Sequence, residues 1–151
     1  MNTTPHHLDI ALGDPLLDAE HAEILRLTDQ LETACGSDNV VLALDALIEH
    51  CVEHFASEDA DLRRISKVED DDAHCHIKEH GAVVASLNEV RAYVAGGAEP
   101  VNVAGNLLAL CRELRRWLPE HVRFMDGAVA HYRTRERFGG APILLSKTVK
   151  R

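Results

Sequence analysis

Residues 54–59 read HFASED and lie in a segment whose apolar residues recur every three or four positions, the spacing of one helix face. The stripe consists of Leu44, Leu47, Cys51, His54, Glu58, Leu62 and Ile65. A histidine and a glutamate are unusual there, because an unpaired polar group in a core costs roughly 1–3 kcal/mol or more. His54 and Glu58 therefore need partners inside the fold.

Three other segments, 17–31, 76–94 and 107–125, have the same periodicity, and turn-like stretches at 34–39, 66–73 and 95–100 separate the four. Four amphipathic helices with mostly short loops fold most simply as an up-down-up-down four-helix bundle. The sequence thus predicts an all-α protein with one domain over residues 1–151. Its helical core should cover about residues 15–134, with the last helix fraying beyond Tyr132.

Composition supports this fold and excludes several partners. Of 151 residues, 46% are hydrophobic and only 4% are aromatic, which suits packed helices better than a sheet. The net charge of −9 leaves no basic surface for nucleic acid or an anionic membrane. No signal peptide, membrane span or C-x-x-C pair is present, so we expect a cytoplasmic protein with free thiols. No protein partner is indicated.

Each of the four stripes contains at least one residue that can bind a metal. Side chains at positions i and i+4 share a helix face, so His54 with Glu58, and His76 with His80, each point two ligands at the bundle axis. The full set is His21, His54, Glu58, His76, His80, His121 and Asp126. One such histidine alone is more often an ordinary core residue, but their coincidence on four helices predicts a metal site.

The number and type of these residues favour two metal ions. A tetrahedral zinc site needs four ligands or fewer, whereas seven suit two ions bridged by the two carboxylates. Imidazole and carboxylate without thiolate favour iron or manganese, with zinc or copper as adventitious occupants.

The motifs DAEH at 18–21, HFASED at 54–59, HIKEH at 76–80 and WLPEHVRFMD at 117–126 resemble those of the hemerythrins, particularly the bacterial ones. The resemblance covers about residues 8–132 and includes all seven ligand positions. It implies a non-haem di-iron centre that binds dioxygen.

By this resemblance, His76, His80 and His121 would hold one iron, and His21 and His54 would hold the other, which keeps an open position. Glu58 and Asp126 would bridge the two irons together with an oxo or hydroxo group. The resemblance also places a pocket for dioxygen around the open iron, formed by Ile24, Phe55, Trp117, Leu118 and Val122. The sequence departs from the family pattern at Asp59 and Leu62, where a second glutamate and a methionine are common.

The fourth helix has two expected irregularities. Pro119 cannot donate a hydrogen bond to the Arg115 carbonyl and should bend the helix. The five-residue spacing between His121 and Asp126 departs from a regular α-helical face and predicts a local π-type turn.

Other candidates receive an ordinary interpretation. His50 lies off its stripe and is expected beside the site rather than in it. The acidic run EDDD at 69–72 is predicted to be a solvated loop. Solvent exposure is expected for His6, His7 and His131, and a free thiol for Cys75.

The function favoured by these observations is reversible dioxygen binding, for carriage, storage or sensing, rather than catalysis. The main alternative is a di-iron enzyme that reduces peroxide or nitric oxide or oxidises ferrous iron. A third possibility is an interaction module in which the metal has only a structural role and holds the helices of the bundle together.

Overall fold

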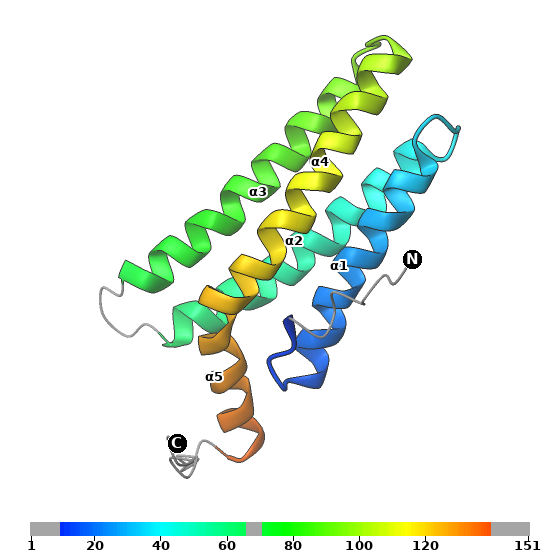
Figure 1. The fold of residues 1–151 in the computed structure, drawn as a ribbon. Coiled ribbons are helices and arrows are strands. Elements are labelled where there is room, and N and C mark those ends of the chain that lie inside the picture. Colours follow the sequence, from blue (N-terminus) through cyan, green and yellow to red (C-terminus); the bar gives the residue numbers. More distant parts are fainter. Residues whose placement is uncertain (1–9, 66–70, 140–151) are drawn as a thin grey trace.

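The structure is a computed structural model, and it describes residues 10–65 and 71–139. The described helices are α1 (Pro15–Ala34), α2 (Val40–Ile65), α3 (Asp71–Ala95), α4 (Pro100–His121), the π-helical segment η2 (Val122–Asp126) and α5 (Gly127–Arg137). Figure 1 shows the four long helices side by side, with α1 and α3 each packed against both α2 and α4. The predicted all-α four-helix bundle is confirmed. No helix in the described ranges is long and apolar enough to cross a membrane.

Local sequence signals explain where the helices begin and end. Pro15 occupies the start of α1, and the Asp14 carboxylate accepts the backbone N–H of Leu17 at 3.0 Å, which caps a helix end that would otherwise lack partners. The turns after α1 and α3 contain Gly36 and Gly97 at φ values of +83° and +78°. Glycine adopts this left-handed conformation without a steric penalty, so both predicted turns form where the sequence places them.

Two apolar clusters make up the core. The large apolar cluster comprises Ile10, Ile24, Leu25, Leu27, Leu31, Leu44, Leu47, Cys51, Phe55, Leu87, Leu107, Cys111, Leu114, Leu118 and Val122. The small apolar cluster comprises Leu17, Leu62, Ala73, Val129 and Ala130. The predicted metal ligands lie between the clusters: along α1, for example, Leu17 of the small cluster precedes His21, and Ile24 of the large cluster follows it.

The segment after α4 confirms one prediction and corrects another. Residues Val122–Asp126 form the predicted π-turn, and the chain changes direction there, just beyond Pro119 (Figure 1). Helix α5 continues to Arg137 instead of fraying past Tyr132. It does so because Arg133 donates to the Asp61 carboxylate of α2 at 2.7 Å and because its apolar side packs in the small cluster.

The acidic run at 69–72 also differs in part from its prediction. Residues 71 and 72 lie in the first turn of α3 rather than in a loop, and the Asp72 carboxylate is favourable at this end of a helix dipole. The rest of the run lies outside the described residues, as do His6, His7 and the tail beyond residue 139.

Candidate metal centre

All seven predicted ligands converge in one buried layer. Helix α1 contributes His21, α2 contributes His54 and Glu58, α3 contributes His76 and His80, and α4 with η2 contributes His121 and Asp126. None of these residues is more than 3% exposed. The i, i+4 pairs do place their side chains on one face, and the π-turn brings Asp126 onto the face that holds His121.

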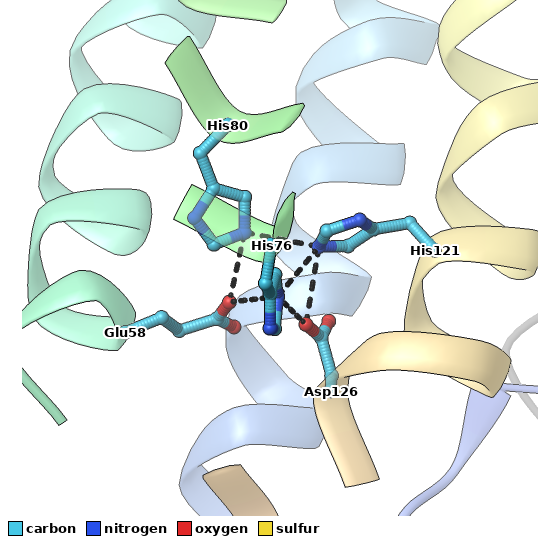
Figure 2. Close-up of side chains that lie close together, drawn as sticks. All are labelled: Glu58, His76, His80, His121 and Asp126. Carbon is cyan, nitrogen blue, oxygen red and sulfur yellow. Dashed lines mark hydrogen bonds and ion pairs between the residues drawn. The ribbon is translucent and has the colours of Figure 1, made fainter. Parts of the chain in front are cut away.

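The three-histidine side of the centre consists of His76, His80 and His121 (Figure 2). The Nε2 atom of His121 lies 3.2 Å from that of His76 and 3.0 Å from that of His80. Glu58 Oε2 lies 3.2 Å from His80 Nε2, and Asp126 Oδ1 lies 2.8 Å from His76 Nε2 and 3.1 Å from His121 Nε2. These five residues offer ligand atoms that all lie within 4.8 Å of one another.

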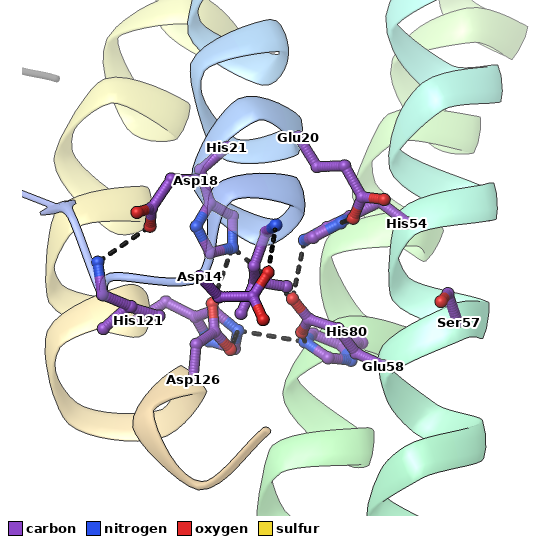
Figure 3. Close-up of polar contacts among 12 residues, drawn as sticks. Asp14, Asp18, Glu20, His21, His54, Ser57, Glu58, His80, His121 and Asp126 are labelled. Carbon is purple, nitrogen blue, oxygen red and sulfur yellow. Dashed lines mark hydrogen bonds and ion pairs between the residues drawn. The ribbon is translucent and has the colours of Figure 1, made fainter. Parts of the chain in front are cut away.

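The two-histidine side consists of His21 and His54, which approach the same carboxylates from α1 and α2 (Figure 3). Glu58 Oε1 lies 2.8 Å from His54 Nε2 and 3.4 Å from His21 Nε2. Asp126 Oδ2 lies 3.0 Å from His21 Nε2. Each carboxylate therefore directs one oxygen to the three-histidine side and the other oxygen to the two-histidine side.

Three of the histidines are oriented by carboxylates on their outer ring nitrogen. A carboxylate can only accept, so Nδ1 carries the proton and the inward Nε2 presents a lone pair. The pairs are His54 with Glu20 at 2.5 Å, His80 with Asp59 at 2.6 Å and His121 with Glu79 at 3.0 Å. This arrangement fixes the tautomer that a metal ligand requires.

The donor set fits a cation. Both Glu58 carboxylate oxygens, Asp126 Oδ2 and His21 Nε2 are buried, and although histidine nitrogens and carboxylate oxygens approach one another here at 2.8–3.4 Å, none of these four atoms makes a well-oriented hydrogen bond to another described residue. Inward Nε2 lone pairs would also face one another at 3.0–3.2 Å. Because buried polar atoms without partners are costly, a positive charge at the centre of this layer would satisfy them.

The opposed charges of this layer shift the pKa values of its own residues. Burial disfavours a charged His54, but the hydrogen bond to Glu20 and the close Glu58 carboxylate outweigh that effect and raise its pKa to about 9. Burial would raise the pKa of Glu58, yet the close contacts with His21, His54 and His80 hold it below its usual range, and the pKa of Asp126 is lowered by its histidine neighbours in the same way. The layer therefore attracts positive charge strongly.

Comparison with known proteins agrees with this geometry. The family model of the hemerythrin HHE cation binding domain matches residues 12–131. The chain belongs to the hemerythrin family. A similar protein, bacteriohemerythrin of Ralstonia nicotianae (strain ATCC BAA-1114 / GMI1000), is 36% identical over 115 residues, which are 76% of this chain and 77% of that protein. No solved structure matches the chain significantly. The matched family is described as a cation binding domain, which agrees with the buried histidines and carboxylates that could hold a metal ion here.

Four of the five side chains expected around dioxygen in this hemerythrin domain belong to the large apolar cluster, and the fifth, Trp117, is partly buried and packs against it. Ile24, Leu118 and Val122 are at most 1% exposed and belong to the large apolar cluster. Phe55 stacks on His80 with ring centroids 4.4 Å apart and contacts the edge of Trp117 at 5.8 Å. The layer above the ligands is thus apolar and closely packed.

The sequence prediction missed the roles of three carboxylates in the hemerythrin site. Glu20 and Glu79 each directly precede a ligand, and Asp59 directly follows one. A residue next to a ligand is rotated by about 100° around the helix and so faces the neighbouring helix. The acidic residues in DAEH, HFASED and HIKEH carried this signal.

The remaining candidates lie outside the ligand set. His50 is placed beside the site, with its Nε2 3.0 Å from the Glu20 carbonyl oxygen and its ring stacked on His54 at 6.2 Å. His131 is exposed, as predicted, and Cys75 is an exposed free thiol. Cys51 and Cys111 are buried in the large apolar cluster.

Proposed function

We propose that this protein binds dioxygen reversibly at two iron ions, for oxygen carriage, storage or sensing. The observation that carries the proposal is the division of the Glu58 and Asp126 oxygens between two sets of histidines. A carboxylate with its two oxygens on different sides suits a bridge between two ions. Two ferrous ions would supply the two electrons that dioxygen takes up on binding and returns on release.

The two sides offer unequal numbers of donors. His76, His80 and His121 with two carboxylate oxygens give five donor atoms for one iron. His21 and His54 with the other two oxygens give four for the second iron. The poorer set has more room for an external ligand, so we assign dioxygen binding to the two-histidine side.

The surroundings of the ligands favour binding over catalysis. Ile24, Leu118 and Val122 offer no proton, and the Trp117 Nε1–H is already donated to Glu79 at 2.7 Å. Apolar surroundings without a proton donor keep water away and do not assist reduction of the bound molecule. Release of unchanged dioxygen is the outcome that such a pocket supports.

The test is an oxygenation cycle. Purified protein loaded with ferrous iron under nitrogen is expected to bind two irons per chain, change its visible spectrum in air and regain the original spectrum when oxygen is removed. Repeated cycles should give the same spectra. Rapid turnover of peroxide or nitric oxide without a stable oxygenated state would instead support the enzyme, and one tightly held ion would refute the di-iron centre.

The bridging role is tested separately. Glu58→Gln and Asp126→Asn each replace a buried anion by a neutral amide, so we expect iron content to fall from two per chain to one or fewer. Glu53→Gln is the control, because Glu53 is exposed on the same helix as Glu58. Equal iron content in all three variants would contradict the bridges.

A further inference from the structure

A single oxygen atom of Glu79 connects the only tryptophan of the chain to a metal ligand. Glu79 Oε1 accepts the Trp117 Nε1–H at 2.7 Å and the His121 Nδ1–H at 3.0 Å. Trp117 and His121 in turn stack on each other, with ring centroids 4.3 Å apart and planes 25° from parallel. One carboxylate from α3 thus holds two rings of α4 in a fixed relation.

Glu79 also faces solvent. Its side chain is 33% exposed and lies at a groove of about 460 Å³ between α3 and α4. The groove wall is mainly apolar and includes Val83, Val90, Leu110, Leu114 and Trp117. A carboxylate exposed beside apolar side chains gains nothing from that wall, so the two hydrogen bonds that it accepts, from Trp117 and His121, are what hold it at this position.

The chemistry of this contact affects the metal ligand. A carboxylate that accepts the outer N–H of a metal-binding histidine fixes its tautomer and ring orientation and raises its basicity. The second hydrogen bond, from Trp117, keeps the same oxygen from rotating away. Trp117 also contacts Phe55, which lies on His80, so the ring stack reaches a second ligand.

We propose that Glu79 is a positioning residue of the metal centre, which fixes His121 as a ligand and holds Trp117 against it. The part that concerns His121 rests on the proposed metal site, whereas the part that concerns Trp117 does not. Removal of the carboxylate frees both rings at once. Replacement by glutamine keeps an accepting oxygen and removes only the charge.

The first measurement uses metal-free protein and the single indole N–H signal in a proton–nitrogen correlation spectrum. Glu79→Leu is expected to shift this signal upfield, because the indole loses its acceptor, whereas Glu79→Gln should largely retain its position. Glu113→Leu is the matched control, since Glu113 lines the same groove but pairs with Arg116 at 2.9 Å. An indole signal that does not move in Glu79→Leu would overturn the contact with Trp117.

The second measurement uses zinc as a redox-inert probe of the ligands. Loss of such an outer carboxylate typically weakens metal binding about 10–100-fold, and we expect this loss in Glu79→Leu, a smaller one in Glu79→Gln and none in Glu113→Leu. Equal zinc affinity in Glu79→Leu and the parent would overturn the positioning of His121. A parent that binds no zinc or iron would refute the proposed function, while the indole signal would still decide the Trp117 contact.

Discussion

Three carboxylates each accept a hydrogen bond from a histidine of the next helix in the chain: those of Glu20, Asp59 and Glu79. Glu20 of α1 accepts from α2, Asp59 of α2 accepts from α3, and Glu79 of α3 accepts from α4. The corresponding contact from α4 back to α1 is missing among the described residues: Glu120, which precedes His121, is exposed and lies 3.7 Å from Arg116. Nδ1 of His21 consequently has no hydrogen-bond partner among the described residues. The two-histidine side is therefore the less firmly oriented of the two.

The residues that could be predicted are those fixed by ligand chemistry. His54 with Glu58, and His76 with His80, are spaced by the helix repeat, so the sequence alone places each pair on one face. Glu20 and Glu79 lie one position away from their stripes, where an exposed glutamate is the usual outcome. Their partners depend on which helices are neighbours and on the rotation of each helix, and neither is set by local spacing.

At Leu118 we predict a change in autoxidation without loss of iron. Leu118→Ala should open the apolar layer above the ligands, admit water and speed oxidation to the ferric form. Leu107→Ala is the control, because Leu107 is equally buried on the same helix but lies about four turns from His121, and both variants should lose about 2–5 kcal/mol of stability. Autoxidation measured by absorbance should be faster only in Leu118→Ala; equal rates would show that general loosening is the cause.

Among the secondary-structure elements, η2 is the one that sets the position of a single predicted ligand, Asp126. Its π-turn absorbs one residue, so that Asp126 returns to the face of His121 and Val129 still reaches the small apolar cluster. The spacing of ligands made this turn predictable. The length of α5 was not, because the contact between Arg133 and Asp61 joins residues 72 positions apart.

A pair of deletions tests this interpretation of η2. Deleting Phe124, which is 77% exposed, leaves His121 and Asp126 four apart in a regular α-helix, so we expect iron binding to survive. Arg112 is exposed in a regular part of α4, where no π-turn can compensate for a deletion. Deleting it rotates every later ligand by about 100° around the helix, so iron binding should be lost. Iron content and circular dichroism would check both variants. Equal loss of iron in the two deletion variants would show that η2 does not simply accommodate one extra residue between His121 and Asp126.

On the scale of the whole molecule, the bundle encloses a charged layer between two apolar clusters. Without metal, the stability of that layer depends on protons and on contacts between histidines and carboxylates. The fold class could be predicted from the hydrophobic periodicity, because each helix buries one apolar stripe whether or not a metal is bound. The division of the core into a large and a small cluster was not predicted, since it depends on how α5 folds back against α2.

Metal removal is therefore expected to lower thermal stability. A ligand present at 100 times its Kd stabilises the folded state by about 2.7 kcal/mol, which for a chain of this size corresponds to roughly 5–11 °C in Tm. Melting curves of iron-loaded and chelator-treated protein would measure the difference, and added ferrous iron should restore it. A metal-free protein that melts with the loaded form would contradict the prediction.

The unequal clusters also give the molecule a weak end. The small apolar cluster has five members, including two alanines, so separating α5 from α1 and α2 exposes far less apolar surface than parting the helices at Leu44 or Leu107. Spontaneous local unfolding should begin there, and native-state hydrogen exchange should show α5 amides exchanging well before those in the middle of α2. Uniform protection of both helices would contradict this order. Iron would then enter and leave through transient detachment of α5, at a rate set by the small apolar cluster and the Arg133–Asp61 ion pair rather than by the stability of the whole bundle.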